Sequence, residues 1–386
     1  MMALGRTLAV ARGVAIASSA AATALAYLAL RHAGAARLVA IAGTAVAAAT
    51  PWDAWLGAAA VPEGFTGALV ACGAIALAAP RPPWWAAAAL LAASLSRYEA
   101  WPACACFTAV AAYRAARRAA TRAGEAPRSG ARGGAAPGGA RHGGDAATAL
   151  LPLLGPIAWM AWNAHAHGSA THFLARVAAY RRAIGAASAP LSEQIAVYPR
   201  SLVADAPDVA AVAALGAVAC FVSRDARARW TSPLSVVAAT LAFLVAGQIG
   251  DGAPTHHPVR ALTPILWVLA PFGVDGARAL AARYAWARAG REAWAVAMAS
   301  GATLFWALGL PARWREAPGR SPSEDRGAQI ARGAELRDAG ARDLAITPCA
   351  FEHFALLSAY GAPERATVAK PTGAPVTPAC PRVDAR

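Results

Sequence analysis

The sequence predicts an all-α, polytopic integral membrane protein with a small C-terminal α/β domain outside the membrane. Hydrophobic residues make up 58% of the 386 residues, and charged residues only 15%. The apolar residues gather into blocks of about 14 to 20, close to the length that crosses a bilayer as a helix. Residues 312–386 lose this hydrophobicity and alternate between helix and strand patterns.

About ten apolar blocks are candidate membrane segments. They lie at 13–30, 38–50, 64–79, 84–96, 98–116, 148–164, 207–222, 232–249, 259–273 and 293–310. The first block is longer than a signal-peptide core, which favours a retained helix. Three blocks, 38–50, 84–96 and 259–273, are short for a full crossing. Re-entrant or half-membrane helices therefore remain open alternatives there.

The distribution of arginine predicts the orientation of these segments, because basic short loops stay cytoplasmic. Alternate loops carry the arginines, namely Arg31 and Arg37, Arg81, Arg114 to Arg141, Arg224, Arg227 and Arg229, and Arg278 to Arg291. The loops between them, such as 51–63 and 250–258, contain Asp53, Glu63 and Asp251 instead. This pattern places Arg97, Glu99, Glu63 and His256 together on the outer face.

The net charge of +15 comes almost entirely from arginine and lies in these short loops. Such a pattern indicates membrane topology, and we expect no nucleic-acid partner. The heavy use of Ala, Gly and Arg fits a GC-rich bacterial genome, so the expected location is the bacterial inner membrane.

Four parts follow from this reading: membrane helices over 1–118, a disordered basic cytoplasmic linker over 119–147, membrane helices over 148–311, and a periplasmic domain over 312–386. The linker is rich in Gly, Pro and Arg without apolar periodicity. In the last part the expected elements are a helix over 323–338, a strand over 344–347, a helix over 350–360 ended by Gly361, and a strand over 366–369. Cys349 and Cys380 would form a disulfide in an oxidising compartment.

Arg97 and Glu99 stand at the junction of two apolar segments, in the stretch SRYEAW. Ionisable groups at the edge of the hydrocarbon region are costly and usually mark a functional cavity. Ser96 and Glu99 have the spacing of a capping box. In that arrangement their side chains would accept hydrogen bonds from backbone N–H groups at the start of the next helix. Two residues apart on a helix, Arg97 and Glu99 would lie on different faces, so Arg97 is expected to bind an anion elsewhere, such as a phosphate.

A second group lies in GQIGDGAPTHHPVRALTP and contains Asp251, His256, His257 and Arg260. The histidines and the arginine suit a phosphate leaving group, on which negative charge develops during transfer. An exposed polar turn is the alternative. A metal site is not expected from two adjacent histidines, and no cofactor is predicted, although assistance by a divalent metal stays open.

A third stretch, residues 159–183, carries Trp159 and Trp162 at the end of an apolar segment, as in the aromatic belt of membrane proteins. The following segment places Phe173, Val177 and Tyr180 on one face, with arginines between them. This pattern is typical of an interfacial helix, which could line a groove for a lipid phosphate.

These features, in this order, resemble the GT-C superfamily of polyprenyl-phosphate-sugar-dependent glycosyltransferases, which includes protein O-mannosyltransferases and aminoarabinose transferases. The matching pieces are ATPWDAWLGAAAVPEGF, SRYEAW, WNAHAHGSATHF and THHPVRALTP, within about residues 10 to 275. The resemblance implies that a glycan, lipid or protein acceptor attacks a lipid-linked sugar on the outer face, with inversion. The donor phosphate would be bound by Arg97, His256, His257 and Arg260, supported by Glu63, Glu99 and Asp251.

The family's general base is an aspartate in the first outer loop, and neither Asp53 nor Glu63 matches its position. The chain begins at the second helix of the family pattern, so the expectation is a truncated or inactive relative, or a chain recorded from too late a start. Two other functions are alternatives: a transporter or flippase for a lipid-linked or anionic substrate, and a non-catalytic membrane scaffold. Internal repeats with broken helices would favour the transporter, and the sequence shows none.

Overall fold

The computed structural model describes residues 8–50, 56–57, 61–125, 139–183, 190–250, 258–284, 326–349, 352–369, 372 and 379–385. The chain divides into two compact units. The larger one, here called the helical unit, comprises Ser19–Ala54 and Pro62–Gly309. The other contains Leu310–Arg386, whose described part, residues 326–385, is here called the C-terminal domain.

The chain is mainly helical. The longer helices up to residue 284 are α1 (Leu8–His32), α2 (Arg37–Ala48), α4 (Glu63–Ala76), α5 (Trp84–Ser96), α6 (Trp101–Glu125), α7 (Gly139–Leu150), α8 (Leu154–His167), α9 (His172–Ala183), α10 (Leu191–Asp205), α11 (Pro207–Val222), α12 (Arg224–Ile249) and α13 (Pro258–Tyr284). Short 3-10 turns join α5 to α6 (η1, Tyr98–Ala100) and α7 to α8 (η2, Leu151–Leu153).

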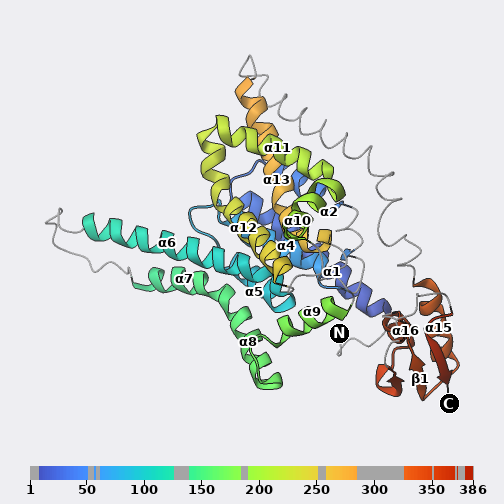
Figure 1. Ribbon diagram of the computed structural model, residues 1–386. Coiled ribbons are helices and arrows are strands. Elements are labelled where there is room, and N and C mark those ends of the chain that lie inside the picture. Colours follow the sequence, from blue (N-terminus) through green and yellow to red (C-terminus); the bar gives the residue numbers. More distant parts are fainter. Residues whose placement is uncertain are drawn as a thin grey trace. The chain divides into compact units, whose positions relative to one another are not determined.

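Helix α13 is the centre of the helical unit and contacts α2, α4, α10, α11 and α12 (Figure 1). Its side chains from Ala261 to Val274 are buried, and Trp267 is among the largest fully buried residues. Small residues allow this close packing. A Cβ atom built on Gly276 would lie 2.4 Å from the Cα atom of Gly216 in α11. Close contacts between small residues are typical of helices that pack without a large aqueous hydrophobic driving force.

Three described helical segments are long and apolar enough to cross a membrane: Ala9–His32, Arg224–Ile249 and Pro258–Arg283. A fourth crossing is counted if α10 and α11 form one span, although these two helices meet at an angle of 99°. Pro207 stands at the start of α11, directly after the break. Proline lacks the N–H that would continue the preceding helix, which accounts for the break.

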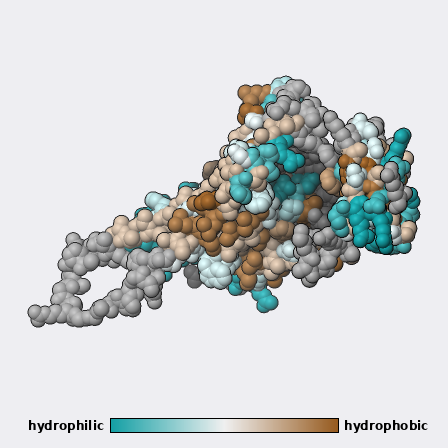
Figure 2. Space-filling model, turned by 90° about the horizontal axis from the view of Figure 1, so that it is seen from below, coloured by the Kyte–Doolittle hydropathy of each residue, from teal (hydrophilic) through white to brown (hydrophobic). Residues whose placement is uncertain are grey.

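Large apolar side chains are exposed on the helical unit. Figure 2 shows brown and tan residues over much of its visible surface. The exposed set includes Leu38, Ile41, Trp84, Leu95, Tyr113, Leu150, Leu154, Ile157, Trp162, Val218 and Phe221. Contiguous apolar surface on this scale is rare on monomeric proteins that face water on all sides. It supports association with a membrane.

Most predicted segments coincide with helices, but several boundaries were wrong. The segment 84–96 matches α5, and 38–50 is a short helix as expected. The segment 148–164 is broken at η2, where Pro152 interrupts the helix. The segment 259–273 is not short, because α13 continues through Pro271 to Tyr284. After residue 274 the sequence loses apolar residues but keeps strong helix formers such as alanine, so the helix continues where the hydropathy falls.

The predicted disordered linker, 119–147, is helical at both ends. Helix α6 continues to Glu125 and α7 begins at Gly139, and residues 126–138 lie outside the described residues. The two helices contact each other and extend away from the rest of the helical unit (Figure 1). The prediction failed at these ends because alanine and arginine, which are frequent there, are strong helix formers even without apolar periodicity. The segment predicted at 293–310 also lies outside the described residues.

The C-terminal domain confirms the predicted α/β pattern and adds one strand. It contains α15 (Gly327–Asp338), β1 (Leu344–Thr347), α16 (His353–Tyr360), the 3-10 turn η5 (Pro363–Arg365), β2 (Ala366–Val368) and β3 (Arg382–Ala385). The strand order is β2-β1-β3, with β1 parallel to β2 and antiparallel to β3. Strand β3 was not predicted. Its four residues carry two charges and no apolar alternation of useful length.

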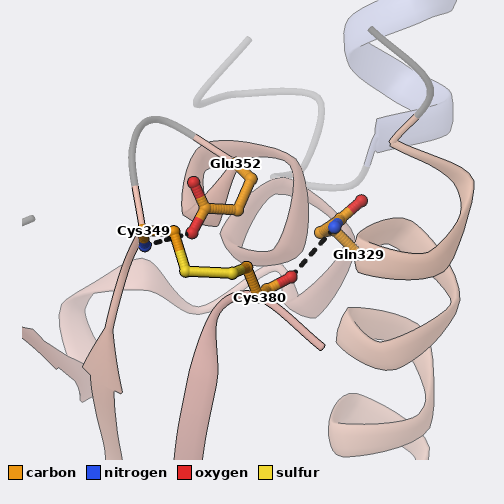
Figure 3. The surroundings of a disulfide bond; sticks show 4 residues. All are labelled: Gln329, Cys349, Glu352 and Cys380. Carbon is orange, nitrogen blue, oxygen red and sulfur yellow. Dashed lines mark hydrogen bonds between the residues drawn. A yellow bond between two sulfur atoms is a disulfide. The ribbon is translucent and has the colours of Figure 1, made fainter. Parts of the chain in front are cut away.

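A disulfide between Cys349 and Cys380 joins the end of β1 to the segment before β3, as predicted (Figure 3). Around it, the Glu352 carboxylate accepts a hydrogen bond of 2.5 Å from the Cys349 N–H. Gln329 donates to the Cys380 carbonyl at 2.9 Å. Leu336, Leu344, Ile346, Leu356 and Tyr360 form the small core of the domain. Gly361 ends α16 with φ +82°, as expected for a left-handed helix C-terminus.

Candidate functional site

Four charged side chains meet where α4 and α13 begin. Glu63 is the first residue of α4, Arg97 follows α5, Glu99 lies in η1 and Arg260 is in the first turn of α13. We call these four residues the Glu63 cluster. The Glu63 Oε1 atom accepts a hydrogen bond from Arg97 Nη1 at 2.7 Å and a second, short one from Arg260 Nη2. Residues that are far apart in the sequence, 97 and 260, therefore share one carboxylate oxygen.

The backbone conformation of Arg97 explains its contact with Glu99, which the sequence analysis did not expect. Arg97 is extended, with φ −151° and ψ 137°, and ends α5. Its guanidinium reaches forward to Glu99, with Nε 3.0 Å from Oε2 and a short contact between Nη2 and Oε1. The expectation that the two side chains point apart was wrong, because it assumed a continuous helix.

The predicted capping box at Ser96 is absent. Its hydroxyl instead donates to the carbonyl of Ala92 at 2.8 Å, one turn earlier in α5. Both carboxylate oxygens of Glu99 accept hydrogen bonds from Arg97. Glu99 therefore serves as an ion-pair partner and not as a cap.

The carboxylates of the cluster are buried while its arginines reach the surface. The side chains of Glu63 and Glu99 are each 4% exposed, against 24% for Arg97 and 30% for Arg260. Burial alone would lower the pKa of Arg97, but the charge and hydrogen bonds of Glu99 and the charge of Glu63 raise it overall. The Arg97 guanidinium thus stays cationic at the surface.

Unused hydrogen-bonding capacity remains in the cluster. A guanidinium has five N–H donors, of which the described contacts of Arg97 use three and those of Arg260 use one. The Glu63 Oε2 atom is buried and has no hydrogen-bond partner within the described residues. Two N–H donors of Arg97 and four of Arg260 therefore remain for a further acceptor.

An aromatic group lies next to the cluster. The Tyr98 ring, between Arg97 and Glu99 in the chain, is 5.3 Å from the Phe173 ring of α9 and 6.4 Å from the Phe243 ring of α12. Trp101 at the start of α6 also contacts Phe173, with 5.3 Å between ring centroids. Phe173 was predicted on the apolar face of an interfacial helix, and here its ring meets those of Tyr98 and Trp101.

A second cluster of similar design, which the sequence reading missed, lies toward the other end of α13. Asp275 is 2% exposed and accepts hydrogen bonds from Arg229 Nη1 at 2.8 Å, Trp230 Nε1 at 2.9 Å and Arg278 Nε at 3.1 Å. Fifteen residues of helix separate Arg260 from Asp275, which corresponds to about 22 Å. The sequence offered one signal for this cluster, the single acidic residue Asp275 at the start of an arginine-containing segment.

The other predicted donor-site residues lie outside the described part of the chain. These are Asp251, His256 and His257, and the loop residue Asp53 lies outside it as well. The belt tryptophans are in α8, where Trp159 is 38% and Trp162 is 60% exposed. Tyr180, also predicted on the interfacial face, has no described side chain.

One grouping of metal-ligand type occurs among the described residues, formed by Cys349, Glu352 and Cys380 in the C-terminal domain. The two sulfur atoms are joined in the disulfide, so neither is available as a thiolate ligand. Glu352 already accepts the hydrogen bond from the Cys349 N–H. This grouping is explained by the disulfide and needs no ion.

Comparison of the chain with protein-family models, with curated proteins and with solved structures finds no match.

Proposed function

We propose that this chain is a multi-pass protein of the bacterial inner membrane and that it transfers a sugar from a polyprenyl-phosphate donor to a cell-envelope acceptor. The observation that carries the proposal is the convergence of Arg97 and Arg260 on the buried Glu63 carboxylate, beside an aromatic group, on a protein with an apolar surface. An amphiphilic phosphate needs cations for its head and apolar contacts for its chain.

In the proposed reaction, a hydroxyl or amine of the acceptor attacks the anomeric carbon of the sugar. The bond between that carbon and the phosphate oxygen breaks, and its electron pair stays on the phosphate. The acceptor proton passes to a general base, a role that we assign to none of the described residues. Arg97 and Arg260 stabilise the negative charge that develops on the phosphate oxygen, a contribution that often dominates the lowering of such barriers.

Glu63 and Glu99 are positioning residues in this scheme. Glu63 holds both guanidinium groups at one oxygen, and Glu99 holds Arg97 in a two-point contact with fixed orientation. His256 and His257 remain proposed partners of the same phosphate, with Asp251 in a supporting role. The expected periplasmic location of the C-terminal domain agrees with its disulfide, because disulfides persist in oxidising compartments.

The test is a transfer assay in membranes with a panel of polyprenyl-phosphate-linked sugars. Arg97→Lys and Arg260→Lys keep the charge but remove the planar fork, so each should lower the release of polyprenyl phosphate about 100-fold. The matched control is Arg278→Lys, which changes an arginine on the buried Asp275 instead and should leave the rate within about twofold. Equal rates in the three variants and the unmodified protein would remove Arg97 and Arg260 from the reaction.

A transporter or flippase of a lipid-linked or anionic substrate is the second candidate, favoured by the 99° break between α10 and α11. Broken helices of this kind often form the substrate sites of transporters. The same assay separates the two candidates. A flippase moves the lipid-linked sugar across the membrane with its glycosidic bond intact, whereas a transferase releases free polyprenyl phosphate.

A further inference from the structure

An open pocket of about 720 Å³ lies at the other end of α4 from Glu63. Its lining includes Arg81, Arg114, Arg117, Arg118, His32 and Thr121, and no acidic residue. We call it the arginine pocket. It joins the end of α1, the loop between α4 and α5, and the middle of α6. The arginine pattern of the sequence assigns these residues to the cytoplasmic side, opposite the Glu63 cluster.

Two of the four arginines hold the pocket in shape. Arg114 Nη1 donates to the carbonyls of Leu77 at 2.6 Å and Ala79 at 3.0 Å, and its Nη2 donates to the Ser232 hydroxyl at 2.8 Å. These bonds satisfy carbonyl groups that the C-terminal end of α4 leaves without helical partners. Arg118 Nη1 donates to the Pro80 carbonyl at 3.1 Å. The loop between α4 and α5 is thereby fixed against α6.

The other two arginines provide charge that nothing described here neutralises. The side chains of Arg81 and Arg117 are exposed and make no hydrogen bond or ion pair within the described ranges of the chain. The Asp145 carboxylate is 3.0 Å from Arg118 Nη2 and is paired there. The Glu63 and Asp275 clusters differ, because each pairs its arginines with buried carboxylates.

Exposed aromatic residues stand close in the sequence to residues that line the pocket. Tyr113 precedes Arg114 and is 66% exposed, and Trp84, shortly after Arg81, is 69% exposed. His32 contacts Trp85 edge-on, with 6.1 Å between ring centroids, and also bonds the Arg81 carbonyl at 3.2 Å. Exposed Trp and Tyr next to arginine are typical of the level of lipid headgroups. The occupant should therefore be an anion available at that level.

We propose that the arginine pocket binds a phosphate-bearing anion, supplied by the headgroup of an anionic phospholipid of the cytoplasmic leaflet. Arg114 and Arg118 preorganise the site, while Arg81 and Arg117 contact the phosphate. Basic pockets between membrane helices on this side attract anionic headgroups. A free phosphate compound has the same recognition chemistry, so the experiment must separate the two sources.

The experiment measures the melting temperature of the purified full chain in neutral detergent against the concentration of added ligand. The ligands are dioctanoyl phosphatidylglycerol, dioctanoyl phosphatidylcholine and glycerol phosphate. Binding to the folded state raises the melting temperature as the ligand concentration exceeds its dissociation constant. Phosphatidylglycerol should stabilise the protein at lower concentration than the other two ligands.

The test variant is Arg81→Gln with Arg117→Gln, and it should weaken phosphatidylglycerol binding about 30-fold. The matched control is Arg37→Gln with Arg224→Gln. It removes two exposed arginines from the same predicted side that do not line the pocket, and should change binding less than about threefold. The melting temperature without ligand reports folding of both variants.

Two results would overturn the proposal. Equal weakening in the two double variants would show a general effect of surface charge and no site. Equal stabilisation by phosphatidylcholine and phosphatidylglycerol would show binding through the acyl chains. If glycerol phosphate binds as tightly as phosphatidylglycerol and with the same dependence on Arg81 and Arg117, the pocket is a phosphate site whose ligand is a free phosphate compound.

Discussion

Arg97 lies in an extended backbone conformation between α5 and η1, and this conformation turns its guanidinium toward Glu99. The sequence identified both residues as functional candidates from their charge at the edge of an apolar segment. It could not show that they pair, because the contact depends on the backbone angles of one residue. Similarly, the pairing of Arg260 with Glu63 depends on how α4 and α13 pack.

Glu63→Gln tests the role of the shared carboxylate. The substitution keeps the size of the side chain but removes the charge that faces two arginines. We expect a loss of about 2 kcal/mol of stability, since hydrogen bonds to charged groups contribute about 1.5 to 3 kcal/mol. For a unit of this size the melting temperature should fall by about 5 °C.

The matched control for Glu63→Gln is Asp145→Asn. The Asp145 carboxylate also pairs with an arginine but is 39% exposed, so its loss should cost less than about 0.5 kcal/mol. Thermal unfolding followed by circular dichroism in neutral detergent would compare the two variants. Equal shifts would mean that Glu63 is no more than a surface partner.

At the scale of the element, the sequence predicted which segments are helical more reliably than where they end. Hydropathy found α5 and α11 almost to the residue, because Pro83 and Pro207 mark their starts. It ended α13 too early, because the last turns of that helix are polar while still favourable for helix. The break at η2 was hidden by uniform hydrophobicity on both sides of Pro152.

Gly276→Ala tests the packing of α13 on α11. The added Cβ atom would lie 2.4 Å from the Gly216 Cα atom and 2.7 Å from its nitrogen, which are backbone atoms that cannot rotate away. Overpacking of this kind costs about 1 to 3 kcal/mol. The measurement is the same melting temperature in neutral detergent.

Gly144→Ala is the control for this substitution, because it is also within a helix but has no atom within 4 Å of a built Cβ. It should stabilise the protein by about 0.5 to 1 kcal/mol, since alanine favours helix over glycine. The two glycine variants are thus expected to shift the melting temperature in opposite directions. A stabilising Gly276→Ala would contradict the close contact between α11 and α13.

At the scale of the whole molecule, the helical unit carries charged sites at both ends of the same helices. The Glu63 cluster includes the first residue of α4. In the arginine pocket, Arg114 donates to the carbonyl of Leu77, directly after the last turn of α4. From Glu63 to Leu77 the helix rises about 21 Å. Hydropathy and arginine counting predicted this two-ended arrangement. The Asp275 cluster and the pocket geometry could not be predicted, since they need the relative positions of α4, α6, α12 and α13.

The central claim is that the helical unit spans a membrane with the Glu63 cluster outside and the arginine pocket inside. Labelling of cysteines with a membrane-impermeant maleimide in intact cells tests it most directly. Ser169→Cys, after α8, and Thr121→Cys, at the pocket, are both exposed positions, and the free cysteines Cys72, Cys104, Cys106 and Cys220 would first be replaced. We expect labelling at position 169 in intact cells, and labelling at position 121 only after the membrane is permeabilised. Labelling of both positions in intact cells, or the reverse order, would contradict the account.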